Sequence, residues 1–240
     1  MKNRIAILGA ISFALLTWAL YEAQVGAPTE ATMGEVQRIF YYHVPSAWTA
    51  YLLFMINCGA SIWYLVKRSQ KADALALATA EVGLVFCTVV LVTGPIWARP
   101  VWGIWWTWDA RLTTTLILWL IYVAYLMLRK FSTGGQTPLV AAVLAVFGFL
   151  DVPLVYWSIR IFRTQHPQSV IAGGEGSGIA PKMLEALMVN WLAFLVFGSV
   201  IVWLRYALER KRQNLNEAFA LKEERSHYKT AVTRPQGVSR

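Results

Sequence analysis

Six long apolar segments constrain the fold of this chain more than any other feature. Each comes close to the roughly 20 apolar residues that a helix needs to cross the hydrocarbon core of a bilayer. Backbone groups in hydrocarbon must hydrogen-bond internally, and the period-two alternation of a membrane barrel is absent, so we expect helices. The composition, 57% hydrophobic and 15% charged, agrees with this interpretation. The expected spans are about 4–19, 47–66, 81–98, 112–128, 138–157 and 183–204.

The first apolar segment follows Lys2 and resembles a signal peptide. The sequence V-G-A over residues 25–27 would pass for a cleavage site, but Pro28 comes directly after it and argues against cleavage. We therefore expect a retained helix. The fold class that follows is an all-α integral membrane protein, with a six-helix bundle over residues 1–204 and a basic cytoplasmic tail over 205–240.

The distribution of lysine and arginine predicts the orientation in the membrane. Sixteen of the 22 lie at the N-terminus, in the second and fourth loops and in the tail, whereas six lie in the other three loops. Because basic residues stay on the cytoplasmic side, we expect a multi-pass protein of the bacterial inner membrane with both termini cytoplasmic. The net charge of +9 reflects this bias and a tail that faces anionic lipid headgroups. It does not indicate nucleic acid.

A tryptophan-rich segment, Arg99–Thr114, lies between the third and fourth spans, where it faces outward. One or two tryptophans there would be an interfacial belt, because the ring is apolar and its N–H seeks a partner. Four tryptophans beside charged residues are too many to anchor one helix end. They favour a flat aromatic surface for a large planar ligand with a few charged groups. The candidate binding residues are Trp102, Trp105, Trp106, Trp108 and Asp109.

The sequence leaves the conformation of this segment open. On a helix, Trp102, Trp105, Trp106 and Asp109 would share one stripe. In an extended segment, Trp102, Trp106 and Trp108 would align instead.

Two of the three histidines flank the tryptophan-rich segment. His43 lies just before Pro45, at the outer start of the second span, and His166 lies in the last outer loop. His227 is in the tail, on the other side of the membrane. Imidazole is a common axial ligand of haem iron, so His43 and His166 are predicted to bind opposite faces of one haem.

The outer arginines suit the two propionates of such a ligand, because a guanidinium fork matches a carboxylate. A zinc site is the rival metal hypothesis, but two histidines without an outer cysteine are too few ligands for it. Cys58 and Cys87 lie inside spans and form no C-x-x-C pair, so we expect them to fill the core. The candidate propionate partners are Arg38, Arg99, Arg111, Arg160 and Arg163.

Asp151, in the fifth span, is the one carboxylate expected within the apolar part of that helix. An isolated charge at the centre of a membrane helix costs about 2.5–3.5 kcal/mol on insertion scales, and less near an edge. We therefore expect Asp151 to face the interior of the bundle.

The run W-G-I-W-W-T-W-D-A-R-L-T resembles the tryptophan-rich signature of the haem-handling proteins of cytochrome c biogenesis. With the segment R-I-F-Y-Y-H-V-P-S-A-W and six spans, the chain resembles the haem exporter protein C family of the system I maturation machinery over about residues 37–204. The resemblance implies that haem b is held transiently at the periplasmic face, with His43 and His166 as axial ligands and residues 102–109 as support.

The resemblance also implies the partners and the kind of activity. The haem would pass to a periplasmic haem chaperone, with the subunits of an ABC transporter and a small single-span accessory protein assisting. The chain would be a haem-binding and transfer protein rather than an enzyme. Two alternatives remain at the level of sequence: a membrane b-type redox protein, and a small-molecule transporter with an interfacial tryptophan belt.

Overall fold

The computed structural model describes residues 2–132, 134–162, 164–167 and 178–233, and is helical almost throughout that part of the chain. Six of its helical segments are long and apolar enough to cross a membrane, which confirms the expected six-helix, all-α membrane fold. The helices are α1 (Lys2–Tyr21), a π-helical turn (Glu22–Gly26), a 3-10 turn (Glu35–Ile39), α2 (Phe40–Lys67), α3 (Gln70–Trp102), α4 (Ala110–Phe131), α5 (Thr137–Phe149), α6 (Asp151–Ile161) and α7 (Pro181–Thr233).

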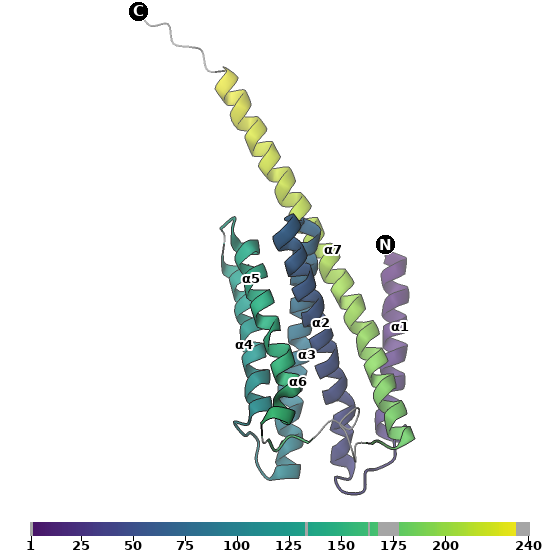
Figure 1. The fold of residues 1–240 in the computed structure, drawn as a ribbon. Helices are drawn as coiled ribbons and strands as arrows, with labels where there is room; N and C mark the ends of the chain where they lie inside the picture. Colours follow the sequence, from purple (N-terminus) through teal and green to yellow (C-terminus); the bar gives the residue numbers. More distant parts are fainter. Residues whose placement is uncertain (1, 133, 163, 168–177, 234–240) are drawn as a thin grey trace, which may run out of the picture.

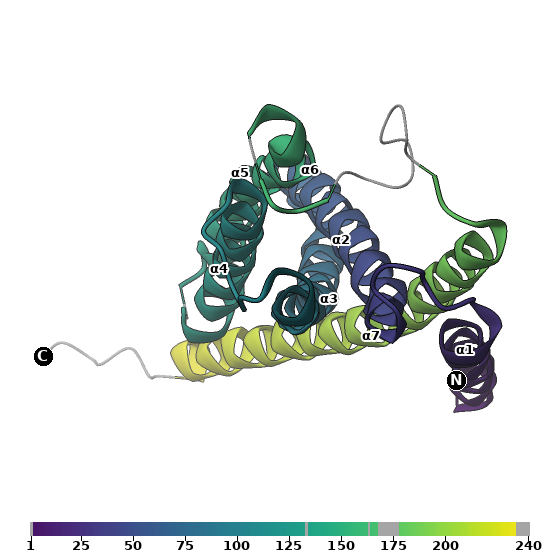
Figure 2. The ribbon, with the colours of Figure 1, turned by 90° about the horizontal axis from the view of Figure 1, so that it is seen from below.

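The helices form a bundle with α2 and α3 at its centre (Figure 1). Helices α4, α5 and α6 pack on one side, whereas α7 and α1 lie on the other, with α1 at the margin (Figure 2). Residues 27–39, 103–109, 162 and 164–167 gather at one end of the bundle, which we call the tryptophan end. Helix α1 starts and α7 projects at the opposite end, which we call the tail end. The two ends of the chain thus leave the bundle on the same side, as six crossings require.

The tight pairing of α2 and α3 comes from small residues. A two-residue turn at Arg68 and Ser69 joins the helices, and the Ser69 hydroxyl caps α3 by accepting from the Ala72 amide at 3.4 Å. Across the helix pair, a Cβ on Gly83 would lie 2.8 Å from a ring carbon of Phe54, so only glycine allows this approach. Helix α3 begins at Gln70 rather than near residue 81, because alanine favours helix strongly. Its first turns are buried through Ala72, Ala74, Ala76, Ala78 and Ala80.

The fifth span is two helices rather than one. The break falls at Leu150, whose amide bonds to the Phe147 carbonyl at 3.1 Å in a tighter turn. Pro153 explains the break, because it has no N–H to donate to the carbonyl four residues earlier. Asp151 follows the break and is only 8% exposed, so it faces the interior as its charge requires.

Buried polar side chains lock the centre of the bundle. The Asn57 amide donates to the Ala76 carbonyl at 2.7 Å, and the Tyr122 hydroxyl donates to the Asn57 side-chain oxygen at 3.3 Å. The Tyr122 ring stacks on Phe54 with 3.7 Å between centroids. These contacts join α2, α3 and α4 within the apolar region, where each unpaired polar group would be costly.

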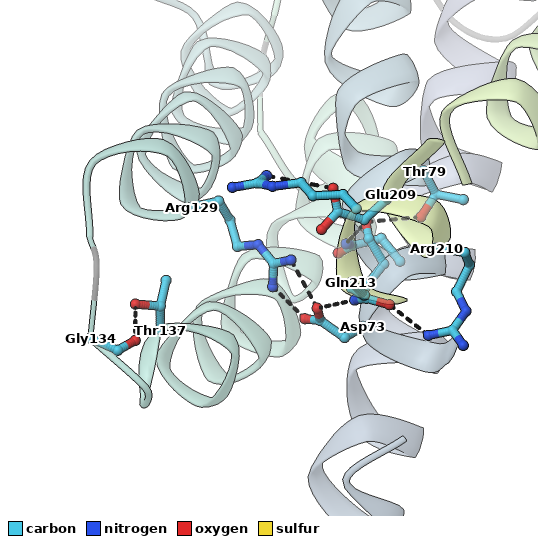
Figure 3. Close-up of polar contacts among 11 residues, drawn as sticks. Asp73, Thr79, Arg129, Gly134, Thr137, Glu209, Arg210 and Gln213 are labelled. Carbon is cyan, nitrogen blue, oxygen red and sulfur yellow. Dashed lines mark hydrogen bonds and ion pairs between the residues drawn. The ribbon is translucent and has the colours of Figure 1, made fainter. Parts of the chain in front are cut away.

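A polar network joins three helices at the tail end (Figure 3). Arg129 on α4 forms a two-pronged ion pair with Asp73 on α3, and the two side chains are 9% and 6% exposed. Gln213 on α7 donates to the same carboxylate at 3.1 Å, and Arg210 donates to the Gln213 oxygen at 2.7 Å. Helix α7 therefore continues unbroken past residue 204, where the sequence suggested that the membrane part ends.

The buried Asp73–Arg129 pair generates a stability prediction. Replacing Arg129 with alanine leaves a buried carboxylate without its cation, which should lower the free energy of unfolding by about 3–5 kcal/mol. The change is measured by SDS titration of the protein in mixed micelles. In the control, Lys182→Ala, the partners of the Lys182–Glu185 pair are 69% and 48% exposed, so stability should hardly change. Equal losses in the two variants would contradict the assigned role of the buried pair.

Candidate metal centre at the tryptophan end

His43 lies in the first turn of α2, facing α3. Its Nδ1 is 2.9 Å from the Thr93 hydroxyl, which itself donates to the Val89 carbonyl at 2.7 Å. Because that hydroxyl has one proton and gives it to Val89, it must accept from the imidazole. The proton of His43 is therefore on Nδ1, and Nε2 carries a lone pair suited to a metal.

His166 presents the same nitrogen by a different contact. Its Nδ1 is 2.9 Å from the carbonyl of Pro167, an oxygen that can only accept, so Nδ1 again carries the proton. Its backbone amide donates to the Thr164 hydroxyl at 3.1 Å, which fixes the turn. Both histidines thus leave Nε2 as the ligating atom, although they come from separate segments.

The two imidazoles and one arginine lie in a shared electrostatic environment. Charges on His43 and His166 would repel each other, and Arg111 acts on both. Burial is the main cause that lowers the pKa of His166 to about 4, and the positive charge of Arg111 acts in the same direction. Asp109 and the Pro167 carbonyl act in the opposite direction. His166 is consequently neutral, and able to ligate a metal, throughout the physiological pH range.

Arg111 points inward from the first turn of α4. One of its terminal nitrogens donates to the Tyr156 carbonyl on α6 at 2.8 Å. Its Nε is buried, and no partner for it occurs among the residues that the structure describes. The guanidinium therefore has donor capacity left for an anionic group. Tyr51, about two turns beyond His43 on α2, interacts electrostatically with both Arg111 and Asp151. Polar groups therefore continue from the two histidines and Arg111 towards the interior of the bundle.

The tryptophan-rich segment adopts neither of the two regular conformations left open by the sequence. Trp102 is the last residue of α3, which ends at Gly103 with φ of 78°, a value that favours glycine. The residues that follow, up to Asp109, are irregular. The helical stripe of tryptophans therefore does not form, because the chain turns after Gly103 and α4 restarts at Ala110.

The tryptophans differ in exposure. Trp105 and Trp108 are 59% and 76% exposed, whereas Trp102 and Trp106 are partly buried. The rings of Trp106 and Trp108 meet edge to face at 5.7 Å. The indole N–H of Trp106 is buried, and no acceptor for it occurs in the described part of the chain. An apolar surface with one unused donor thus lies at the tryptophan end.

The charged candidates Asp109, Arg38 and Arg99 form contacts that stabilise the local fold. Asp109 caps α4 by accepting from the Leu112 amide at 3.0 Å. Arg38 donates to the carbonyls of Ala23 and Ala27 at 2.8 and 3.2 Å and pairs with Glu35, so it closes the first loop. Arg99 is exposed and bonds to the carbonyl of Gly103 at the end of its own helix. Of the arginines named in the sequence analysis, Arg111 is placed with the two histidines, Arg160 lies over the Tyr156 ring at 5.7 Å from its centroid, and Arg163 lies outside the described residues.

Two contributors were missed in the sequence. Thr93 sets the tautomer of His43, and Trp97 packs edge to face against the His43 ring at 5.9 Å. Their spacing of four residues on one helix places them on the same face, beside Gly94 and Pro95. That spacing was a usable signal. No three His, Cys, Asp or Glu residues gather as a metal site in the parts of the chain that are described.

The fold and this centre define a class: a polytopic α-helical membrane protein with two neutral imidazoles and an aromatic surface at one end. A family model described as Heme exporter protein C matches residues 1–220. The chain belongs to that family.

Individual relatives agree with the family match. The Heme exporter protein C of Bradyrhizobium diazoefficiens is 36% identical over 78% of this chain and 71% of its own length. That of Haemophilus influenzae is 32% identical over 89% of this chain and 90% of its own. A putative cytochrome c biosynthesis ccmC-like mitochondrial protein of Marchantia polymorpha is 31% identical over 86% and 91%. The similarity therefore extends over most of each protein.

The low pKa of His166 generates a pH prediction. An unperturbed histidine takes up a proton near pH 6.5, whereas His166 in the folded protein should do so near pH 4. The folded state then binds fewer protons between these values, so its stability falls as the pH is lowered from about 6.5 towards 4. NMR of the ¹⁵N-histidine-labelled protein measures the midpoint. A midpoint for His166 near 6.5 would contradict the prediction.

Proposed function

We propose that this chain binds haem b at the tryptophan end and delivers it to a periplasmic haem chaperone during the maturation of c-type cytochromes. Membership of the Heme exporter protein C family implies a role in haem handling. The observation that carries the proposal is that His43 and His166 are each held by a hydrogen bond at Nδ1, which leaves both Nε2 atoms unprotonated and able to bind iron. Such a pair suits the two axial positions of one haem iron.

The surroundings of the histidines suit the rest of a haem. Trp97 and the exposed rings of Trp105 and Trp108 supply apolar surface for the macrocycle. Arg111 has donors for a propionate, and its guanidinium lies in the electrostatic range of both histidines. We propose Trp102, Trp106 and Asp109 as supporting residues, with Asp109 acting through the cap of α4 that positions Arg111.

The ligand placement favours a carrier over an enzyme. His166 lies in an irregular segment and His43 in the first turn of a helix, where opening costs less than within a helix. Ligands of this kind can release haem without unfolding a span. A b-type redox protein that moves electrons across the bilayer would use one haem near each side of the membrane. His43 and His166 both lie at the tryptophan end.

The partners follow from the same proposal. The chaperone would approach the tryptophan end, where Trp105 and Trp108 are exposed. The subunits of an ABC transporter and a single-span accessory protein would contact the spans and the tail end within the same inner membrane. This arrangement requires the tryptophan end to be periplasmic and both termini to be cytoplasmic.

Removing either ligand tests the haem site. His43→Ala and His166→Ala should each lose most of the Soret absorbance expected to co-purify with the wild-type protein, because each variant removes one of the two proposed axial ligands. The matched control is His227→Ala, in the tail-end part of α7, which should retain full absorbance. Normal Soret bands and normal delivery to the chaperone in both single variants would overturn the assignment.

Cysteine labelling tests the orientation. Thr32, at the tryptophan end, and Gln136, at the tail end, are exposed, whereas Cys58 and Cys87 are buried and should react little. In intact spheroplasts, an impermeant maleimide should label Thr32→Cys at once and Gln136→Cys only after lysis. The reverse pattern would place the tryptophan end in the cytoplasm and exclude periplasmic delivery.

A further inference from the structure

Helix α7 carries an unpartnered apolar ridge where it projects beyond the bundle (Figure 1). Leu208, Leu215 and Phe219 are 57%, 49% and 62% exposed. Their spacings of seven and four residues place them on one face of the helix. We call these three residues the α7 ridge.

The opposite face of the same helix is attached to the bundle, which fixes the direction of the ridge. Gln213 donates to Asp73 on α3, and Glu209 is 12% exposed and interacts electrostatically with Arg129 on α4 (Figure 3). Gln213 is about 140° around the helix from Leu208 at 100° per residue. The ridge therefore points away from α3 and α4, and nothing among the described residues covers it.

Positive charges flank the ridge. Lys211 and Arg212 occupy the turns between Leu208 and Leu215, and Lys222 follows Phe219 by three residues. Arg212 is held by Glu209 at 3.6 Å, and Glu223 lies at the far edge of the ridge. A helix face with apolar anchors and a cationic margin complements an apolar groove with carboxylates at its rim.

The length of α7 beyond the membrane decides whether the α7 ridge can contact a protein or a lipid surface. Phe219 is 15 residues beyond Leu204, or about 22 Å along the helix. The headgroup region on each side of the hydrocarbon is only about 5–8 Å thick. Figure 1 shows α7 continuing obliquely away from the tail end of the bundle, so we expect Leu215 and Phe219 to lie beyond the lipid.

We infer that the α7 ridge is the docking surface for an acidic, apolar groove on a cytoplasmic protein subunit. The inference rests on the proposed function for the identity of that subunit, since the nucleotide-binding subunit of an ABC transporter is the cytoplasmic partner that the function requires. Leu208, Leu215 and Phe219 enter the groove, and Lys211 and Lys222 meet its acidic rim. The Asp73–Arg129–Gln213 network holds the ridge in the orientation that docking needs.

The test measures binding of the full-length chain in lipid nanodiscs to the purified nucleotide-binding subunit by biolayer interferometry. Leu215→Asn with Phe219→Asn should weaken binding tenfold or more, as expected for central apolar anchors. Lys211→Glu with Lys222→Glu should slow association and reduce its dependence on salt. The matched controls are Leu221→Asn, which is 58% exposed on another face of the helix, and Arg225→Glu, and both should bind within twofold of the wild type.

Two outcomes would overturn the inference. Equal binding by the ridge and control variants would show that the ridge makes no contact with the subunit. Quenching of a fluorophore at Phe219→Cys by spin-labelled lipid, in nanodiscs of 30% anionic lipid without partner, would show that the membrane covers the ridge.

The haem measurement separates this inference from the proposed function. The Soret band is recorded in the same nanodiscs, and the ridge variants should retain it because the ridge and the histidines lie at opposite ends. Loss of docking with a normal Soret band supports the ridge alone. An absent Soret band in the wild type would count against the haem site while leaving the binding comparison readable.

Discussion

Backbone hydrogen bonding in hydrocarbon organises this structure. A peptide group inside the bilayer core has no water to bond to, so each span must complete its hydrogen bonds within a helix. Irregular segments are consequently confined to the two ends of the bundle. His166 lies at one of these ends, and the carbonyl of an irregular segment orients its ring.

The same constraint explains how two unrelated segments produce equivalent ligands. His43 is oriented by Thr93, a hydroxyl whose own proton is committed to the carbonyl of Val89. His166 is oriented by the Pro167 carbonyl. Each imidazole is therefore restricted to one tautomer before any metal binds, which lowers the cost of ordering the ligands.

The sequence predicted the number and type of the spans, because hydropathy over about 20 residues is set by the membrane itself. It also predicted that Asp151 faces the interior, since the alternative is too costly. It did not predict the start of α3 at Gln70. The alanines after that residue are only moderately apolar, and the buried pairing of Asp73 with Arg129 is a tertiary contact.

The candidate site was predictable in part. The histidines and tryptophans stood out by type and position, and their roles remain predictions. The arginines could not be ranked from sequence, because their partners are backbone carbonyls that the fold brings to them. Arg38 closes a loop and Arg111 points inward, although both lie near the tryptophan end. Thr93 was missed because a threonine in an apolar helix is unremarkable until its neighbour is known.

Helix α7 is continuous from Pro181, at the tryptophan end, to Thr233 beyond the opposite end. A helix of this length resists bending, so it transmits tilt and rotation as a stiff lever. The Gln213–Asp73 hydrogen bond ties the start of its projecting part to α3, whereas its earlier turns pack on α1, α2 and α3 within the bundle. Where a partner bound at one end of such a helix changes the affinity at the other end, thermodynamic reciprocity requires the converse change to be by the same factor.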